Sequence, residues 1–216
     1  MMKIRRAVVM GSGVMGAQIA AVLAAAGVRV HVLDLASAEP PNLASLPKEL
    51  QKDARLPKLL QKNFRSARAI LAIEGLKYLR PSPLFSPSHM QNIIPGNFED
   101  DMSVLADADW VIEAVIEKLE IKKDLHKKMA EIVRPGVPVT TNTSGISLSS
   151  ICEDLPEHYQ SAFFGTHFFN PPRYMRLLEV IAHPDTDRKL MDALSRWIDH
   201  RLGKGLVEAL DTVNFI

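Results

Sequence analysis

The 216-residue sequence predicts an α/β domain in which helices cover both faces of a doubly wound, mostly parallel sheet. Strand-like and helix-like segments alternate from the first residues onward. The first apolar run, residues 7–10, is unbroken, as expected of a central parallel strand that is buried on both faces. A glycine-rich turn follows this run and opens directly into an alanine-rich segment, which is typical of a strand–turn–helix unit.

The remaining elements follow in order along the chain. The first helix begins near Gly16 and ends at Gly27, a residue suited to the position after a helix C-terminus. The second strand is expected at residues 28–33, just before Asp34. Further strands are expected at 110–115, 137–141, 163–168 and 177–181, a helix at 187–202, and a short extended segment near 206–210.

The segment between Asp34 and Ile93 departs from this alternation, because it contains no convincing core strand. Residues 48–79 are rich in helix formers and in Lys and Arg, and Pro57 interrupts them. We therefore expect a helical excursion after the second strand, at about residues 47–80, standing away from the sheet. The proline-rich residues 81–90 would form the loop that returns to the sheet.

Composition excludes several classes of function. The net charge of +1 provides no overall attraction to nucleic acid or to a membrane surface. The apolar run near the N-terminus breaks at Gly11, too early for a secretory signal or for membrane insertion. The single Cys152 excludes a disulfide framework and suits a reducing compartment, so a cytoplasmic location is expected. The other histidines are scattered, and no metal site is predicted.

The glycine-rich turn matches the dinucleotide-binding pattern G-x-G-x-x-G of Rossmann-type folds. Gly11 permits the tight turn, Gly13 lets the backbone approach a pyrophosphate, and Gly16 allows close packing of helix and strand. The N–H groups at the helix start, around Val14 and Met15, would face the phosphates. A tight turn that binds nothing is the alternative, but the strand before it and the helix after it favour nucleotide binding.

Asp34 indicates which dinucleotide is bound. It ends the second strand, where a carboxylate accepts hydrogen bonds from the adenosine ribose hydroxyls and repels a 2′-phosphate. Leu35 and Ala36 follow, with no arginine to receive such a phosphate, so NAD is favoured over NADP. FAD uses the same glycine pattern, but no other segment supports it.

A second group of polar residues lies between Thr140 and Ile181. Ser144 follows an apolar strand, His167 lies near the end of another strand, and Asn170 is in the turn after it. Glu179 stands in the apolar strand LLEVI, where a carboxylate is costly without a partner. A histidine partner would remove that cost, because the carboxylate would orient the imidazole so that its second nitrogen acts as a base.

Each of these residues also has a simpler structural explanation. A single histidine on an apolar strand is more often a hydrogen-bonded core residue than a catalyst. Glu179 could belong to a surface strand or a structural ion pair, and Ser144 could simply cap the next helix. Spacing alone leaves the His167–Glu179 pair undecided.

The sequence resembles the L-3-hydroxyacyl-CoA dehydrogenases of fatty-acid β-oxidation over essentially the whole chain. The segments that carry the resemblance are GSGVMG, VIEAVIEKLEIKK, TNTSGIS, GTHFFNPPRY, LLEVI and DTVNFI. It implies NAD-dependent oxidation of L-3-hydroxyacyl-CoA to 3-ketoacyl-CoA. By this resemblance His167 is the base, Glu179 orients it, Ser144 binds the substrate oxygen, and Asn170 supports the His167 region.

The resemblance also implies roles for residues outside the catalytic group. Ala114, Glu117 and Lys122 match family positions that line the cofactor, and Asn142 is expected beside the nicotinamide. In the family the helical excursion contacts coenzyme A, which makes candidates of four cations that could equally form a solvated helix face: Lys58, Lys62, Arg65 and Arg68.

The resemblance further predicts how the chain is divided. Residues 1–204 would form the NAD-binding domain, and residues 205–216 the truncated start of a linker to a helical C-terminal domain that closes the substrate cleft and forms the oligomer interface. Val213 replaces a proline that is usual in the family. The segments KYLRPSPLF and IIPGNFEDD resemble bacterial multifunctional members with an enoyl-CoA hydratase-like module.

Two other functions remain open at this point. The chain could bind NAD(H) without turnover, because the expected C-terminal domain is missing from it. It could instead belong to a related dehydrogenase of a small hydroxy acid, although the basic excursion weighs against that.

Overall fold

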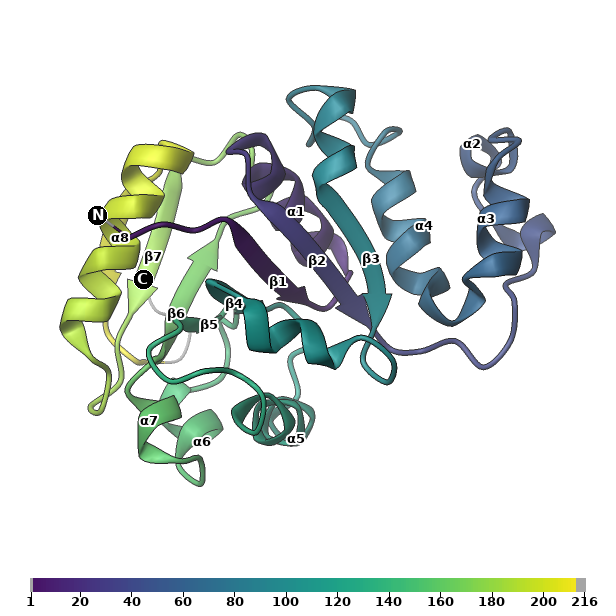
Figure 1. Ribbon diagram of the computed structural model, residues 1–216. Coiled ribbons are helices and arrows are strands. Elements are labelled where there is room, and N and C mark those ends of the chain that lie inside the picture. The colour runs from purple at the N-terminus through teal and green to yellow at the C-terminus, as the bar shows by residue number, and fades with distance from the viewer. Residues whose placement is uncertain (1, 213–216) are drawn as a thin grey trace.

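The computed structural model describes residues 2–212, and their strands form one sheet in the order β3-β2-β1-β4-β5-β6-β7-β8 (Figure 1). The strands are β1 (Arg6–Met10), β2 (Arg29–Asp34), β3 (Ile93–Asn97), β4 (Trp110–Glu113), β5 (Val139–Thr141), β6 (Phe163–Phe168), β7 (Leu177–Ile181) and β8 (Gly205–Ala209). All neighbours pair in parallel except β6 and β7, which are antiparallel. The predicted mostly parallel, doubly wound sheet is confirmed.

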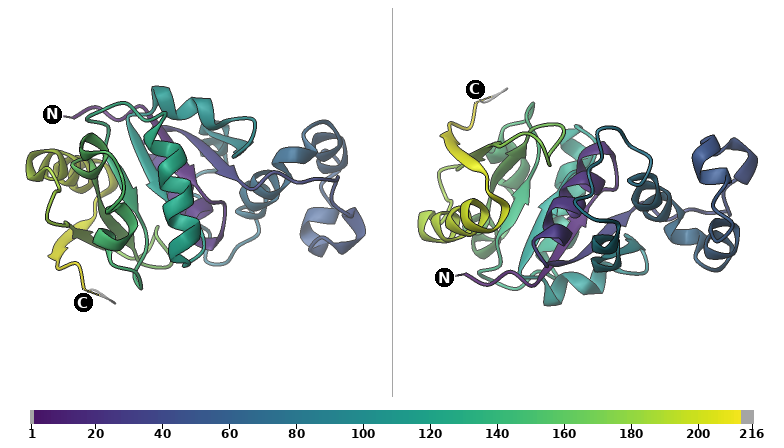
Figure 2. Two further views of the ribbon diagram at one scale, coloured as in Figure 1. Left: turned by 90° about the horizontal axis from the view of Figure 1, so that it is seen from below. Right: turned by 90° about the horizontal axis from the view of Figure 1, so that it is seen from above.

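Helices cover both faces of this sheet (Figure 2). One face carries α1 (Val14–Ala25), α4 (Ala67–Gly75) and α8 (Arg188–Leu202), and the other carries α5 (Leu119–Ala130), α6 (Leu148–Cys152) and α7 (Glu157–Gln160). The apolar side chains of the strands divide between two buried clusters, one for each face. Burial on both faces explains why the central strands β1 and β4 are nearly continuous apolar runs in the sequence.

The helical excursion contains α2 (Lys48–Gln51), α3 (Leu56–Lys62) and α4, with short 3₁₀ helices at Leu43–Ser45 and Phe64–Ser66. Only α2 and α3 stand away from the sheet, around a small core of their own (Figures 1 and 2). The prediction was wrong for α4, because its residues Ala69 and Ile73 join the main core. Pro57 lies in the first turn of α3, where its missing N–H needs no partner.

The sequence patterns missed strand β3. Its Pro95 argues against a central strand, since proline cannot donate to the sheet's hydrogen-bond ladder. β3 is an edge strand that pairs only with β2, so Pro95 can direct its nitrogen away from the sheet. Two further 3₁₀ helices, Pro87–Asn92 and Met102–Asp107, flank this strand in the chain.

The extended segment expected near residues 206–210 is β8, which pairs with β7 as the last strand of the sheet. The sheet therefore extends beyond residue 204, where the sequence pattern placed the end of the domain. Residues 213–216, including Val213, lie outside the described part of the chain. Within residues 2–212, no helix combines the length and the apolar character that crossing a membrane requires.

Candidate active site

The glycine-rich turn connects β1 to α1 at the carboxyl edge of the sheet, where open α/β sheets bind ligands. Gly11 has φ +107°, and a Cβ there would lie 2.6 Å from the carbonyl oxygen of Ala114. A Cβ on Gly16 would lie 1.9 Å from the oxygen of Gly11. A Cβ on Gly13 would meet no atom within 4 Å. Gly11 and Gly16 are thus required by packing, whereas Gly13 leaves the backbone open on its outer side.

The N-terminus of α1 fits a phosphate group. No side chain caps this helix, in contrast to α8, where Asp187 accepts hydrogen bonds from two backbone N–H groups. Val14 and Met15 form the first turn, and the Val14 side chain is exposed. Uncapped N–H groups and the helix dipole both favour an anion.

Asp34 ends β2 and holds the glycine-rich turn. Its Oδ2 accepts hydrogen bonds from the backbone nitrogen of Ser12, at 2.6 Å, and from its hydroxyl, at 2.7 Å. Its Oδ1 accepts a hydrogen bond from the backbone nitrogen of Leu35. Asp34 is only partly buried, and a carboxylate has about four acceptor positions, so room remains for a ribose hydroxyl.

A pocket of about 350 Å³ opens beside this turn at the ends of β4, β5 and β6. Most of the predicted catalytic and nicotinamide-side residues come together here. Its lining residues are Met15, Ala114, Val115, Glu117, Asn142, Ser144, His167, Phe168, Phe169 and Asn170.

His167 and Glu179 face each other across the antiparallel pair β6–β7. Nδ1 of His167 lies 2.6 Å from Oε2 of Glu179, so the predicted pair is present. The Glu179 side chain is 2% exposed and that of His167 is 19% exposed. The imidazole therefore reaches the pocket, while the carboxylate that orients it is shielded from water.

Asn142 and Asn170 make contacts that hold the end of β6 in place. Oδ1 of Asn142, just after β5, accepts a hydrogen bond from the backbone nitrogen of Phe168 at 2.9 Å. Oδ1 of Asn170 lies 3.4 Å from Nε2 of Gln18 on α1. These contacts tie the segment around His167 to β5 and to the cofactor-binding helix.

Glu117 holds the turn that carries Ser144. Its Oε1 accepts hydrogen bonds from the Gly145 nitrogen at 2.9 Å, from the Ser144 nitrogen at 3.3 Å, and from the Thr143 hydroxyl. Burial raises the pKa of Glu117, but the hydrogen bonds from Thr143 and Gly145 and the nearby Lys122 outweigh it, and the net shift is downward. The carboxylate form thus fixes the backbone next to Ser144.

Lys122 does not line the pocket, which differs from the expectation that it contacts the cofactor. Its side chain is 1% exposed, and Nζ lies 2.8 and 2.9 Å from the two oxygens of Glu113 and 3.4 Å from Oε2 of Glu117. Lys122 thus lies behind Glu117, since an ammonium this deep needs carboxylate partners more than access to a ligand.

Glu113 is the functional-site neighbour that the sequence patterns overlooked. It is fully buried at the end of β4 and also accepts hydrogen bonds from the Val115 nitrogen and the Thr141 hydroxyl. Burial raises its pKa, but His126 and Lys122 more than reverse this and lower it to about 2. The pattern WVIE, a carboxylate ending an apolar strand, was the available signal.

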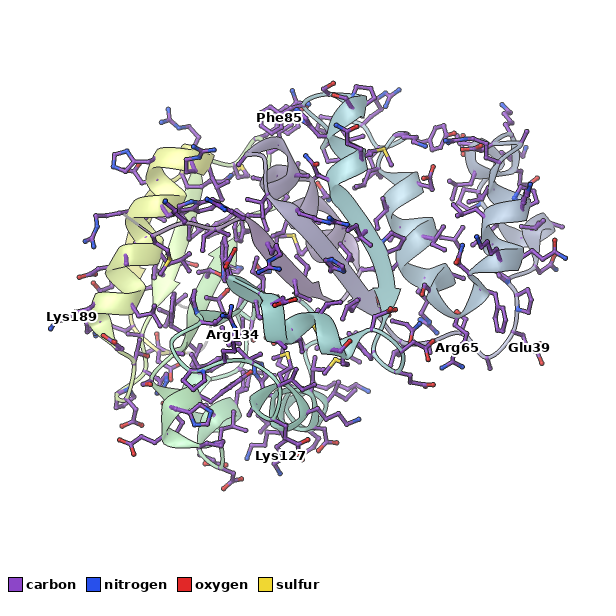
Figure 3. All side chains as sticks on the ribbon, in the orientation of Figure 1. Glu39, Arg65, Phe85, Lys127, Arg134 and Lys189 are labelled. Carbon is purple, nitrogen blue, oxygen red and sulfur yellow. The ribbon has the colours of Figure 1, made fainter. Side chains whose placement is uncertain are left out.

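The four cations expected to contact coenzyme A lie outside this pocket. Arg65, at the base of the excursion (Figure 3), already pairs with Glu99 and Asp100 at 2.7 and 2.6 Å. Lys58, Lys62 and Arg68 are exposed, and Lys58 borders a separate cavity of about 500 Å³ beside α3. Among the described residues, no cluster of His, Cys, Asp or Glu could hold a metal ion.

A glycine-rich turn of the dinucleotide-binding type, with a histidine oriented beside the same pocket, defines the class of this fold as a dinucleotide-binding domain. The chain belongs to the family described as 3-hydroxyacyl-CoA dehydrogenase, NAD binding domain, whose model matches residues 6–212. Its cofactor is NAD, as the family resemblance and Asp34 predicted.

Named relatives agree with this family. The chain is 43% identical over 216 residues to a probable 3-hydroxyacyl-CoA dehydrogenase of Bacillus subtilis, covering 99% of the chain and 26% of that protein. It is 35% identical over 214 residues to a putative fatty acid oxidation complex trifunctional enzyme of Rickettsia felis, covering 99% of the chain and 27% of that protein. The chain thus spans about a quarter of the length of these two relatives.

A solved structure of 3-hydroxybutyryl-CoA dehydrogenase from Escherichia coli K12 has the same fold. The TM-score is 0.69 and the sequence identity 30%, and the match covers 99% of this chain and 40% of that chain.

Proposed function

We propose that the protein to which this chain contributes oxidises L-3-hydroxyacyl-CoA to 3-ketoacyl-CoA with NAD in fatty-acid β-oxidation. The observation that carries the proposal is the His167–Glu179 pair in the pocket beside the glycine-rich turn. The names of the relatives support a CoA thioester as the substrate.

His167 is the proposed base. Glu179 accepts a hydrogen bond from the Nδ1–H group of His167, which sets the tautomer in which Nε2 takes the proton of the substrate's 3-hydroxyl group. As that proton arrives, the buried carboxylate stabilises the imidazolium. Glu179 acts through His167 and is itself shielded from the substrate by burial.

Ser144 and Asn170 are the proposed polar contacts around the reacting carbon. The Ser144 hydroxyl would donate a hydrogen bond to the substrate oxygen, which gains double-bond character as the O–H proton and the C3 hydride leave. Asn170, tied to Gln18, would keep the loop after β6 against the cofactor helix.

The cofactor would lie along the carboxyl edge of the sheet. The turn from Gly11 to Gly16 would bind its pyrophosphate and Asp34 its adenosine ribose, while Ala114, Glu117 and Asn142 would border its nicotinamide half. When bound, NAD⁺ supplies the acceptor for the hydride that leaves C3 of the substrate. Lys122 would serve this half only indirectly, by holding Glu117.

The excursion is proposed to meet the coenzyme A portion through Lys58, Lys62 and Arg68, which are exposed. Arg65 is the weakest candidate, because its guanidinium is already paired. We also propose that the protein includes a helical C-terminal domain, which forms an oligomer interface, and a fused hydratase-like module. The pairing of β8 with β7 favours a domain boundary after Ala209 rather than at 204. A cytoplasmic location, supported by the single Cys152, belongs to the same proposal.

The test follows NADH absorbance after addition of acetoacetyl-CoA, with His167→Ala as the control. We expect consumption of NADH that is lost in the variant. NADH binding without consumption would make this chain an NAD(H)-binding piece without turnover. Equal rates with free acetoacetate would instead favour a dehydrogenase of small hydroxy acids.

A further inference from the structure

Asp211, two residues beyond β8, binds the segment that follows Ser144. Its carboxylate accepts four hydrogen bonds: from the Leu148 nitrogen at 2.7 Å, the Ser149 nitrogen at 3.1 Å, and the hydroxyls of Ser147 and Ser149 at 2.9 and 3.0 Å. More than sixty residues separate the partners in sequence. One side chain of the C-terminal segment thus accepts hydrogen bonds from the first two backbone N–H groups of α6 and from two neighbouring hydroxyls.

The other end of the Ser144 turn is held by Glu117, through the backbone nitrogens of Ser144 and Gly145. Only Gly145 and Ile146 separate Ser144 from the Asp211-bound residues that begin at Ser147. Ser144 therefore lies in a short turn with a carboxylate anchor on each side. Loss of either anchor would leave the position of the Ser144 hydroxyl less well fixed.

Asp211 is charged under ordinary conditions. Burial raises its pKa, but hydrogen bonds from the nitrogens of Leu148 and Ser149 and from the Ser147 hydroxyl outweigh it, so the net pKa lies below the usual range. A charged acceptor of several hydrogen bonds holds its donors more firmly than a neutral one.

The same C-terminal segment also holds the loop after His167. Lys204, just before β8, is buried and donates from Nζ to the carbonyl oxygens of Pro172 and Met175. The backbone nitrogen of Gly205 donates to the oxygen of Arg176. Residues 204–211 thus contact both the segment that follows Ser144 and the loop that follows His167.

We infer that Asp211 is a positioning residue for Ser144, which makes the segment after β8 part of the active-site framework. This inference rests on the proposed function of Ser144. A displacement of Asp211 would move the turn with it, so the chain that leaves β8 is mechanically coupled to the substrate oxygen contact. Asp211 itself does not line the pocket.

The test compares Asp211→Ala with Asp187→Ala in this chain. Asp187 is the matched control, because it caps α8 with the same chemistry but lies outside the pocket lining. We expect Asp211→Ala to lower kcat for acetoacetyl-CoA reduction about 10- to 100-fold, since small misplacements near the reacting atoms have effects of that size. KM for NADH should stay near the wild-type value, and Asp211→Asn, which keeps one acceptor oxygen, should recover part of kcat. Asp187→Ala should lower thermal stability and leave kcat unchanged.

Amide hydrogen exchange at Leu148 and Ser149 provides a readout that does not depend on turnover. Protection at both positions should fall in Asp211→Ala and not in Asp187→Ala. Unchanged protection, or lost protection with wild-type kcat, would overturn the inference. Wild-type chain that binds NADH but reduces no acetoacetyl-CoA would contradict the proposed function instead, and exchange would still decide whether Asp211 holds the turn.

Discussion

At the scale of single residues, two buried carboxylates show how a partner decides the role of a side chain. Glu179 and Glu113 both stand in apolar strands. Glu179 pairs with His167, and it faces a pocket through that partner. Glu113 pairs with Lys122 and is closed off from solvent. The His167–Glu179 pair, which reaches the pocket, suits proton transfer. The enclosed Glu113–Lys122 pair suits structural support of the site.

Replacing Glu179 by Gln tests the first pair. We expect kcat for acetoacetyl-CoA reduction to fall by about 10² or more, because the amide no longer fixes the tautomer or stabilises the imidazolium. The NADH dissociation constant, measured by fluorescence titration, should remain at the wild-type value. Glu208→Gln, an exposed glutamate of β8, is the matched control. A parallel loss of NADH binding would show instead that Glu179 is needed for the fold of the pocket.

At the scale of elements, the buried Glu113 carboxylate connects the end of β4 to β5 and to α5. Glu113 accepts hydrogen bonds from Thr141 of β5 and from Lys122 of α5. Glu117, in the connection from β4 to α5, extends this contact to the turn of Ser144. The cofactor side of the pocket therefore rests on the buried ion pair between Glu113 and Lys122.

The variant Lys122→Met tests the Glu113–Lys122 ion pair through the pH dependence of the unfolding free energy. We expect a loss of about 3–5 kcal/mol in unfolding free energy at pH 7, because Glu113 is left buried without its cation. In the wild type the pKa of Glu113 is about 2, so its contribution is present above the ordinary pKa and is lost as pH falls toward 2. In the variant the pKa of Glu113 in the folded state rises, so acidification neutralises the buried carboxylate. The difference in unfolding free energy between variant and wild type therefore narrows from pH 7 to pH 5.

Urea unfolding at the two pH values measures this gap. The double variant Glu113→Gln/Lys122→Met is the control, because it removes both charges and should recover much of the stability. A gap of equal size at pH 7 and pH 5 would contradict the role given to Glu113.

At the scale of the whole molecule, α4 joins apolar cores of different size, because its residues belong both to the main core and to the small core of the excursion. The sheet and its helices share two large buried clusters, whereas α2 and α3 rest on a few residues around Leu50, Leu56 and Leu60. The excursion extends from one end of the sheet in every view (Figures 1 and 2). It can therefore open locally without unfolding the nucleotide-binding part.

Leu60→Ala tests this division. Leu60 is 1% exposed, so we expect a local cost of about 2–5 kcal/mol from the lost contacts and the cavity. Hydrogen exchange should rise across α2 and α3 and stay unchanged in β1 and α1. The KM for acetoacetyl-CoA should rise while NADH binding is retained, and Leu59→Ala, at a 36% exposed neighbour, is the control. Loss of NADH binding would mean that the excursion and the sheet unfold together.

Local sequence patterns predicted the parallel sheet, the glycine-rich turn and the preference for NAD, and they offered the pairing of His167 with Glu179 as a hypothesis that the family resemblance favoured. These features have local causes: apolar runs of strand length, glycines where a Cβ would collide, and a carboxylate that is costly without a partner. The tertiary structure alone decided that Pro95 belongs to a strand, because only the strand order makes β3 an edge. It also decided that α4 packs on the sheet, that Lys122 lies behind Glu117, and that Asp211 reaches the turn of Ser144. The edge position of β3, the packing of α4 and the reach of Asp211 depend on contacts between segments far apart in the chain, and the place of Lys122 depends on how the turn between β4 and α5 folds back.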